Sequence, residues 1–565
     1  MDSKNKNQKI SGGQAVVETL KAEKVSHVFG LIGSATMELF DALYDAKSIK
    51  FIDVRDERTG THMADGYARA SGKPGIIIAG QNGPGATNLV TGVAQAKAAF
   101  SPVISIAGAI STEHEGKDAF QEVDQQSLFE PITKKTFTVR QTELIPLTLK
   151  KAFSLALTPR CGPVHLNFPR NILANVCKFD EIQKHEKKKL SSINENDLIN
   201  ILKIINKANR PVIIAGGGIK NSLSHETVLK ISTHLNIPIV SSAGHGDVIP
   251  SDERLYAGQM GPRGNPVASK LVKDADVILA LGTRLGFNST FYSYDNINRE
   301  ADIIQIDVDK MSLGRYFPIT LGICNDVKDL TEKLFMKVKE KKITSSFYSW
   351  TEKFLENKKN YLEKRELEAD LNSNPIQPSG LFKVLRETLP KNCAITLDAG
   401  TLCLQATDML NFSNPRSFFT PLDFGLVGFS FACGLGVKLA KPDVPVISLM
   451  GDGGFGMTLS ELSTAVNHKI NTVTIVMNNK SWGAEKAYQR DFYNERYIGA
   501  DISSPPFNKI AELYGAKGYH VEKLSELKDA LKEALNCKKP AVINVEVDPQ
   551  ALYSFRRDSF QHKHK

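Results

Sequence analysis

The chain has 565 residues, of which 41% are hydrophobic and 24% are charged, as is usual for globular proteins. This length predicts about three domains, and no apolar run reaches the roughly 18 residues of a membrane span. The formal net charge is +9, but much of the basic surplus lies in KHEKKK, KVKEKK and HKHK, which we interpret as solvated linkers and ends. Nucleic-acid binding would need a basic face or element, so we expect neither a nucleic-acid nor a membrane partner.

The cysteines and the first residues bear on where the protein works. The seven cysteines are scattered, at positions 161, 177, 324, 393, 403, 433 and 537, and never form a CxxC pair. Such a set is typical of a reduced protein without a disulfide framework or a zinc site. The segment MDSKNKNQKISGG has no apolar core of a secretory signal. We therefore expect a cytoplasmic protein.

Strand-like apolar runs alternate with helix-like amphipathic runs along the whole chain, which predicts α/β domains with parallel sheets. The first third has expected strands at HVFGLI, IKFIDV, GIIIAG, PVISIAG and PVHLNFP, and expected helices at GQAVVETLKAE and ATNLVTGVAQAKAAF. Two lysine-rich stretches, the second largely helical, divide the chain near residues 185 and 365. We expect three doubly wound parallel-sheet domains, at 1–185, 186–365 and 366–565.

The middle block begins with PVIIAGGGI and continues with ADVILALG and ADIIQIDVD. Three glycines after a strand favour a tight turn over a nucleotide site, although the acidic end of IIQIDVD could accept a ribose hydroxyl. Whether this block holds a nucleotide stays open. The last block contains AITLDAGT and AVINVEV, and it shares the strand–helix alternation of the first block. The first and last blocks could therefore be structural relatives.

The most informative segment runs from Gly451 to Asn479. An apolar strand, VPVISLM, leads into Gly-Asp-Gly, a helix-like stretch follows, and a second apolar strand, TVTIVM, ends at Asn478 and Asn479. Two strand ends thus present a carboxylate and a carboxamide, whose oxygens suit a hard divalent cation. The glycines leave backbone N–H groups free at a helix start, where phosphates bind. The segment predicts a magnesium and diphosphate site.

This order of GDG, helix, strand and NN resembles the signature of thiamine diphosphate enzymes. The resemblance implies that Asp452 and Asn479 bind Mg²⁺ by their side chains and Ser481 by its backbone carbonyl. Val427 takes the place of the apolar residue that supports the bent cofactor in this family. The implied cofactor-binding residues are Gly400, Thr401, Val427, Gly451, Asp452, Gly453, Gly454 and Asn479.

The first block carries two further elements that fit the family. VRDERTGTHMADGYARASG resembles its Glu…Ala-Asp-Gly-Tyr-Ala-Arg segment, which implies that Glu57 contacts the aminopyrimidine of the cofactor and drives it to the imino form. In GIIIAGQNGPGATN a tight turn begins a helix, and Gln81 and Asn82 supply neutral hydrogen-bonding groups near the expected substrate oxygen. Because the family builds each active site from two subunits, a homodimer or homotetramer is implied.

The domain order resembles the acetolactate synthase and pyruvate oxidase group, and the finer similarity is to the sulfoacetaldehyde acetyltransferases. It rests on FGLIGSATMELFDAL, QNGPG, FQEVDQ, PRSFF, WGAEK, DFYNERY and FRRD. This branch implies conversion of a small anion, sulfoacetaldehyde, and inorganic phosphate to acetyl phosphate and sulfite. Four cations in or beside these segments are candidate ligands for sulfonate or phosphate: Lys486, Arg490, Arg556 and Arg557.

Two segments of the first block depart from that branch. Arg55-Asp56-Glu57-Arg58 replaces a His-Glu-Gly type of sequence, and Ala98-Ala99-Phe100 replaces a cluster of aromatic residues and histidine. These positions should line the substrate side of the site, so the exact substrate stays open. The alternatives are an acetolactate synthase-like enzyme that uses pyruvate, a decarboxylase of a sulfonated or phosphonated 2-oxo acid, and a noncatalytic subunit. FAD, which the pyruvate-using alternative would usually bind, is not expected, though the sequence leaves it open.

Overall fold

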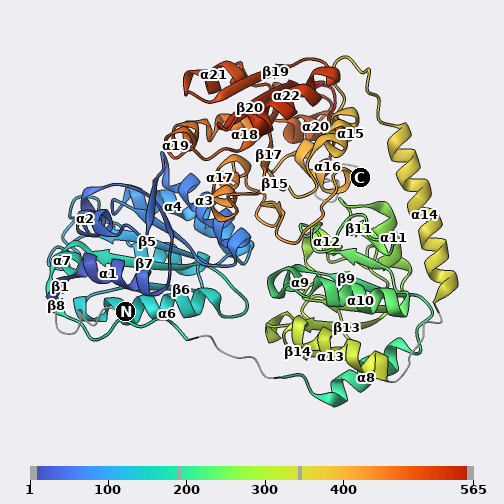
Figure 1. Cartoon of the computed structure of the whole chain (residues 1–565), viewed down its shortest axis with the longest axis horizontal. Helices are drawn as coiled ribbons and strands as arrows, with labels where there is room; N and C mark the ends of the chain where they lie inside the picture. Colours follow the sequence, from blue (N-terminus) through green and yellow to red (C-terminus); the bar gives the residue numbers. More distant parts are fainter. Residues whose placement is uncertain (1–8, 187–191, 341–346, 556–565) are drawn as a thin grey trace.

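A computed structural model describes residues 9–186, 192–340 and 347–555 of the chain. It contains three sheets of six parallel strands, each with helices packed against it (Figure 1). The prediction of three doubly wound α/β domains is therefore confirmed. In the described part of the chain, no helix combines the length and the apolar character needed to cross a membrane.

The N-terminal domain, blue to teal in Figure 1, has the strand order β3-β2-β4-β5-β7-β6. Its strands are short apolar runs, as expected for a parallel sheet covered on both faces. They are β2 (His27–Leu31), β3 (Lys50–Asp53), β4 (Gly75–Ala79), β5 (Val103–Ala109), β6 (Lys135–Thr138) and β7 (Val164–Pro169). The helices are α1 (Gly12–Ala22), α2 (Met37–Asp45), α3 (Glu57–Ser71), α4 (Pro84–Ala98), α5 (Gln125–Phe129), α6 (Ile145–Leu157) and α7 (Arg170–Ala174). A small antiparallel pair joins β1 (Lys9–Ser11) to β8 (Val176–Lys178).

The central domain, green in Figure 1, has the strand order β11-β10-β9-β12-β13-β14. In chain order this is 3-2-1-4-5-6, the order of dinucleotide-binding sheets. The strands are β9 (Pro211–Ala215), β10 (Ile239–Ser241), β11 (Tyr256–Gln259), β12 (Val277–Leu281), β13 (Asp302–Asp307) and β14 (Leu321–Cys324). The helices are α8 (Glu195–Ile205), α9 (Gly217–Ser222), α10 (His225–Leu235), α11 (Pro266–Asp274), α12 (Phe287–Thr290) and α13 (Val327–Glu340).

The long helix α14 (Tyr348–Leu367) runs from the central to the C-terminal domain along one side of the molecule (Figure 1). The C-terminal strands are β15 (Ala394–Leu397), β16 (Phe418–Phe419), β17 (Val446–Gly451), β18 (Val473–Asn478), β19 (Lys517–Val521) and β20 (Ala541–Glu546). The helices are α15 (Pro378–Thr388), α16 (Thr401–Met409), α17 (Ser430–Ala440), α18 (Asp452–Gly456), α19 (Leu462–Asn467), α20 (Gly483–Phe492), α21 (Phe507–Leu513) and α22 (Leu524–Asn536).

The first and last domains share one topology. The C-terminal order, β16-β15-β17-β18-β20-β19, and the N-terminal order are both 2-1-3-4-6-5 in chain order. The sequence alternates strands and helices in the same way in both domains, and the structure shows that the two sheets also have the same strand order. The strands β6, β16 and β19 of these two domains were not among the expected strands, because none of them is an uninterrupted run of branched apolar residues.

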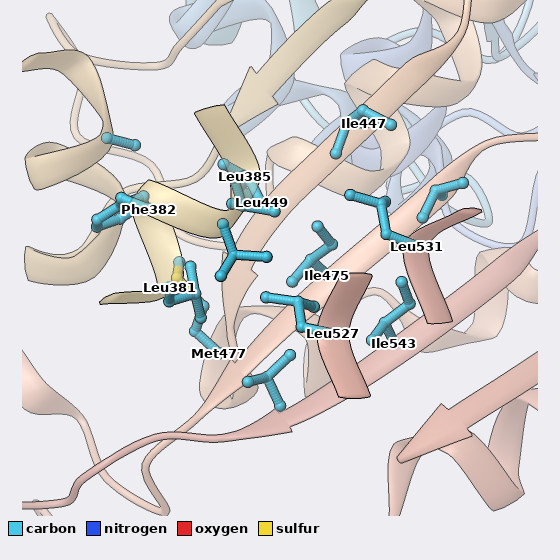
Figure 2. Close-up of a cluster of buried hydrophobic side chains, with 14 of the residues drawn as sticks. Leu381, Phe382, Leu385, Ile447, Leu449, Ile475, Met477, Leu527, Leu531 and Ile543 are labelled. Atoms are coloured by element: carbon cyan, nitrogen blue, oxygen red, sulfur yellow. The ribbon is translucent and has the colours of Figure 1, made fainter. Parts of the chain in front are cut away.

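The core of the C-terminal domain lies between its sheet and helices α15 and α22 (Figure 2). Helix α22 places Leu524, Leu527 and Leu531 at helical spacing on its buried face. Leu527 and Leu531 lie over Ile475 and Ile543 on neighbouring strands, and Leu524 belongs to the same buried cluster. Truncating one such residue to alanine would cost roughly 2–5 kcal/mol of unfolding free energy. This core fixes the carboxyl ends of β17 and β18, where the predicted metal ligands follow.

Helices α3 and α17 join the first and last domains by backbone contact. A Cβ atom at Gly66 would lie 2.3 Å from the Cys433 carbonyl oxygen, and one at Gly436 would lie 1.9 Å from that of Met63. Glycine at these two positions is what lets the helices approach so closely. The beginning of α3, which carries Glu57, is therefore held firmly against the C-terminal domain.

Candidate active site

The metal motif forms where two neighbouring strands end. Strands β17 and β18 pair in parallel, with Gly451 opposite Met477. Asp452 follows β17 directly, and Asn479 follows β18 directly. Both side chains are buried. The structure thus brings together the carboxylate and the carboxamide that the sequence placed at adjacent strand ends.

The Asn479 amide, the Ser481 carbonyl oxygen and Asp452 Oδ1 meet at this point. Without a cation, the amide satisfies its hydrogen bonds when its NH₂ group donates to the Ser481 carbonyl oxygen at 3.1 Å and to Asp452 Oδ1 at 3.3 Å. Turned over, the same amide would present its oxygen beside these two oxygens. Oxygen-only ligand sets of this kind are what Mg²⁺ takes. The residues present therefore fit a magnesium ion.

The rest of the described chain offers no competing metal cluster. Among residues 9–186, 192–340 and 347–555, no group of three or more His, Cys, Asp and Glu side chains is placed to hold a metal. Burial raises the pKa of the Asp452 carboxyl, and its other oxygen accepts a hydrogen bond from the Ser504 hydroxyl. A bound cation would favour the ionised form of this carboxyl.

A cavity of about 480 Å³ opens beside the metal motif. The nine C-terminal residues expected to hold the cofactor or its metal all line it: Gly400, Thr401, Val427, Gly451, Asp452, Gly453, Gly454, Asn479 and Ser481. The backbone of Gly400 borders open space, since a Cβ atom there would meet nothing within 4 Å. Its φ of +136° also requires glycine. The open backbone beside the cation ligands suits a diphosphate group.

Asp398 shapes this cavity, and the sequence reasoning did not single it out. It follows β15 directly, and its carboxylate accepts hydrogen bonds from the backbone N–H groups of Gly428 at 2.9 Å and Phe429 at 2.7 Å. These bonds fix the loop that carries Val427. A Cβ atom at Gly454 would lie 2.1 Å from Asp398 Oδ2, so Gly454 lets this carboxylate fit. Burial raises the pKa of Asp398 to about 6. In the sequence, the signal that could have identified Asp398 is a single carboxylate directly after an apolar strand.

Glu57 is the first residue of α3, and Asp56 caps the helix by accepting the Arg58 N–H at 2.7 Å. The Glu57 side chain is buried, and burial raises the pKa of its carboxyl. The Asn88 side chain, on α4, donates to Glu57 Oε2 at 3.1 Å and opposes that rise. Asn88 is a second residue that the sequence reasoning missed, because it lies 31 residues further along the chain, beyond α3 and β4. Glu57 does not line the 480 Å³ cavity.

The turn at Gln81 and Asn82 lies next to Glu57. A Cβ atom at Gly85 would be 3.1 Å from Glu57 Oε1 and 3.3 Å from Gln81 Cβ. Gln81 exchanges hydrogen bonds with the Ser34 hydroxyl at 3.2–3.3 Å. Asn82 turns the other way, and its amide nitrogen donates to the Gln121 carbonyl at 2.8 Å. Gln81 therefore stays beside Glu57, whereas the Asn82 amide nitrogen holds the loop that contains the FQEVDQ motif.

The four candidate cations lie away from the cavity or outside the described residues. Lys486 forms an ion pair with Asp501 at 2.5 Å, and Arg490 forms one with Asp491 at 2.7 Å. Neither lines the cavity; helix α20 presents Ala484, Glu485 and Tyr488 to it instead. Lys486 and Arg490, four residues apart, share another face of this helix. Arg556 and Arg557 lie outside the described residues.

A second cavity, of about 360 Å³, lies at the junction of the three domains. Gly217, Gly218 and Asp307 line it, at the ends of β9 and β13. Asp307 forms an ion pair with Arg160 of the N-terminal domain at 3.0 Å. The Arg160 guanidinium also stacks 4.4 Å from the ring centre of Phe100. The acidic strand end that could accept a ribose hydroxyl is therefore occupied by an arginine.

Comparisons with known proteins match these three domains one by one. Residues 10–128 match the thiamine pyrophosphate enzyme N-terminal TPP binding domain, residues 198–334 the central domain, and residues 398–545 the C-terminal TPP binding domain. The chain therefore belongs to the thiamine pyrophosphate enzymes, whose cofactor is also called thiamine diphosphate. The family resemblance inferred from the two cofactor motifs is confirmed.

Similarity to individual relatives extends over nearly the full length. The chain is 34% identical to a probable acetolactate synthase large subunit of Methanococcus aeolicus, over 96% of this chain and 93% of the relative. It is 33% identical to a sulfoacetaldehyde acetyltransferase of Castellaniella defragrans, over 98% and 96%. It is 32% identical to an acetolactate synthase large subunit of Haemophilus influenzae, over 96% and 95%. Identities this similar leave the substrate unsettled.

Proposed function

We propose that the protein uses thiamine diphosphate and Mg²⁺ to convert sulfoacetaldehyde and inorganic phosphate to acetyl phosphate and sulfite. The observation that carries the proposal is the position of the WGAEK segment. Trp482 and Glu485 line the cavity of the metal motif, so the segment that resembles the sulfoacetaldehyde acetyltransferases lies where it can contact the reacting centre. The full-length similarity to a relative of that name supports the same reading.

The C-terminal domain would hold the cofactor by its diphosphate end. Asp452, Asn479 and the Ser481 carbonyl would bind Mg²⁺, and the backbone N–H groups near Gly400 and Gly453 would bind the diphosphate. Val427, held by the Asp398 loop, would support the bent form. When bound, thiamine diphosphate supplies a carbon nucleophile and an electron sink.

Glu57 would supply the proton transfer that activates the cofactor. Its carboxyl is buried, and its raised pKa keeps a proton on it to higher pH than on an exposed glutamate. Such a carboxyl can donate a proton to a ring nitrogen and take it back. Asn88 and Gln81 lie beside it and would orient the carboxyl and the substrate oxygen.

We also propose that a second copy of the chain completes each site. Within one chain Glu57 does not line the cavity that holds the metal residues. Two large apolar side chains, Ile32 and Phe120, are exposed around the Gln81 turn, and Phe424 is exposed at the cavity. Burying these residues between two copies would join the Glu57 turn of one chain to the metal motif of the other.

The test is an activity screen with thiamine diphosphate, Mg²⁺ and phosphate, comparing sulfoacetaldehyde, pyruvate and glyoxylate. The expected result is phosphate-dependent release of sulfite together with formation of acetyl phosphate. Consumption of pyruvate without any sulfite release would overturn the proposal. It would favour the acetolactate synthase-like alternative, which the 34% identity to the Methanococcus aeolicus relative supports.

A further inference from the structure

The loop between α20 and α21 returns to the metal motif. In this loop, the Ser504 hydroxyl donates a hydrogen bond to Oδ2 of Asp452. The other oxygen of this buried carboxyl, Oδ1, faces the Asn479 amide at 3.3 Å. The two oxygens of Asp452 therefore have different surroundings, because one accepts a hydroxyl and the other points to the remaining expected metal ligands.

The backbone of the loop is fixed against the residues that follow β18. Ser481 and Asp501 form an antiparallel bridge, and two backbone hydrogen bonds of 2.7 and 3.0 Å flank it, between residues 480–482 and residues 500–502. Ser504 lies just beyond this paired segment. Its place beside the metal motif is therefore set by the backbone, and not by its own hydrogen bond alone.

Lys486, an expected ligand of the substrate anion, anchors this loop instead. Its ammonium group lies 2.5 Å from the Asp501 carboxylate and 5.4 Å from the ring centre of Tyr497. The Lys486 side chain is only 13% exposed, whereas that of Asp501 is 69% exposed. The lysine of the WGAEK segment thus holds the loop that carries Ser504 against α20.

The chain that follows Ser504 is fixed as well. Two prolines, at positions 505 and 506, restrict its backbone, and Phe507 is buried at the start of α21. The Phe507 ring packs edge-on against that of Phe455, with the ring centres 5.2 Å apart. Because Phe455 lies on α18, which begins with Asp452, both partners of the hydrogen bond belong to one packed unit.

We infer that Ser504 is a positioning residue for the metal site. By holding Oδ2 of Asp452, its hydroxyl presents Oδ1 to an ion that the Asn479 amide oxygen and the Ser481 carbonyl would share. The inference rests on the proposed function, since it requires Mg²⁺ to bind at Asp452. It adds a residue that does not touch the ion and that sets which carboxylate oxygen does.

Mg²⁺ makes the orientation of this carboxylate important, because it demands a nearly ideal octahedron of oxygen ligands. A carboxylate held by one oxygen binds through the other, whereas a carboxylate without such a partner can turn either oxygen, or both, towards the ion. Ca²⁺ accepts carboxylates in both ways and in a more flexible geometry. Loss of the Ser504 hydroxyl should therefore cost more affinity for Mg²⁺ than for Ca²⁺.

Trp482 makes this inference testable without turnover. Its ring lies against the metal motif, since a Cβ atom at Gly453 would be 2.6 Å from it. The second of the chain's two tryptophans, Trp350, lies on α14 with its indole N–H bonded to the Pro211 carbonyl. In a Trp350→Phe background, Trp482 fluorescence of the full chain in saturating thiamine diphosphate is followed during titration with Mg²⁺ and, separately, with Ca²⁺. The measured quantity is the ion concentration that half-saturates the signal.

Ser504→Ala is expected to raise the half-saturating Mg²⁺ concentration by about 10-fold or more, the usual effect of removing a partner of a metal ligand. It should raise the Ca²⁺ concentration by a smaller factor. Ser504→Thr keeps a hydroxyl and should restore both values to near those of the wild type. The matched control is Ser503→Ala, which removes the same group from an exposed neighbour. It should leave both values within about twofold.

Two results would overturn the inference. The first is a half-saturating Mg²⁺ concentration in Ser504→Ala within about twofold of the wild type. The second is an equal loss of affinity for Mg²⁺ and Ca²⁺, because a general loosening of the fold would produce it. If Ser504→Ala does not fold, as judged by its melting temperature, the similarly shaped pair Ser504→Thr and Ser504→Val decides by the same two criteria.

The ion titrations also separate this inference from the proposed function. A wild type that binds thiamine diphosphate without depending on either ion would overturn the proposed metal site, and the role of Ser504 with it. An enzyme that uses only pyruvate would overturn the proposed substrate alone, because the titrations contain no substrate.

Discussion

Glu461 of the C-terminal domain accepts a hydrogen bond at 2.9 Å from the backbone N–H of Arg55, two residues before Glu57. The Glu461 side chain is fully buried, and it also accepts bonds from the hydroxyls of Thr59 and Thr464. One carboxylate thus ties the start of α3 to the segment between the two expected metal ligands, Asp452 and Asn479. The position of Glu57 relative to the C-terminal domain depends on it.

Glu461→Ala is expected to lower the free energy of unfolding by roughly 2–3 kcal/mol, because it leaves the buried hydroxyls of Thr59 and Thr464 without their acceptor. Glu461→Gln should cost less, since its amide keeps one acceptor oxygen. Chemical denaturation of the whole chain measures both. The control is Glu533→Ala, at an exposed position of α22. Equal stability of Glu461→Ala and the control would contradict the role given to Glu461.

Glu57→Gln is expected to reduce kcat by about 10²- to 10⁴-fold, the usual contribution of a proton-transfer group. The glutamine is nearly the same size and still accepts the Asn88 bond, so the melting temperature and thiamine diphosphate affinity should change little. Turnover is measured on whichever substrate the screen identifies. Unchanged turnover would remove Glu57 from the reaction and leave the noncatalytic alternative open.

Mixing two inactive variants tests whether each site is shared between chains. Glu57→Gln disables the N-terminal contribution, and Asp452→Ala disables the metal motif. If sites form between two copies, a mixed dimer contains one site with both changes and one intact site. After dissociation and reassociation in equal amounts, about a quarter of wild-type activity should return. No recovery in a mixture shown to contain mixed dimers would place each site within one chain.

Asn88→Ala is expected to move the limb of the pH–activity profile that reports Glu57 to higher pH. The Asn88 N–H stabilises the ionised carboxylate, so its loss raises the Glu57 pKa further. The shift has this sign whether the active form is ionised or protonated. The neighbouring variant Thr87→Ala, whose hydroxyl bonds to the Pro84 carbonyl, is the control. Profiles of kcat/KM that coincide for the two variants would contradict the Asn88 role.

The parts of the site that follow buried strands were predictable from the sequence. Asp452 and Asn479 come at the ends of two apolar runs, and parallel neighbours bring such ends together at one sheet edge. The three domains were predictable because strand-like apolar runs alternate with helix-like amphipathic runs in each third of the chain. A glycine or a capping side chain precedes several of the helices that follow strands, as Asp56 does for α3 and Gly83 for α4, so the local pattern agrees with the fold there.

Side-chain direction and contacts across the chain were not predictable. WGAEK marks a helix, but whether Lys486 or Glu485 faces the cavity depends on how α20 packs. Asn88 lies next to Glu57 because α3 and α4 pack together, and Arg263 reaches the cavity because the central domain lies beside it. Such proximity depends on tertiary packing, which residue periodicity within one segment does not describe.

Asn479→Ala is expected to weaken Mg²⁺ binding by roughly 10- to 100-fold, because it removes the amide oxygen that would bind the ion together with Asp452 and the Ser481 carbonyl. The readout is the Mg²⁺ concentration that half-saturates thiamine diphosphate binding, followed by Trp482 fluorescence. The control is Asn536→Ala, at a residue whose amide nitrogen donates to the Lys532 carbonyl within α22. An unchanged Mg²⁺ requirement in Asn479→Ala would remove this residue from the metal site.

In the chain without cofactor, Asp398 makes the free energy of unfolding depend on pH, and the raised pKa of its carboxyl sets the direction. Burial raises the folded pKa of Asp398 to about 6, above its ordinary 3.8. The stabilisation from its protonated form is therefore complete below pH 3.8 and is lost as the pH rises through 6. Asp398→Asn is uncharged at every pH and lacks this dependence. The difference in unfolding free energy, wild type minus variant, should fall by on the order of 1 kcal/mol between pH 5 and pH 7.

Denaturation of the chain without cofactor and metal at each pH measures this difference. The matched control is Asp443→Asn, at an exposed position after α17, which should follow the wild-type pH dependence throughout. The backbone N–H groups of Gly428 and Phe429 favour the ionised carboxylate of Asp398, but desolvation is the larger effect and sets the sign. A difference that rises with pH would mean that these two bonds outweigh burial. Asp398 would then be ionised throughout, and the Val427 loop would be held by a full charge at every working pH.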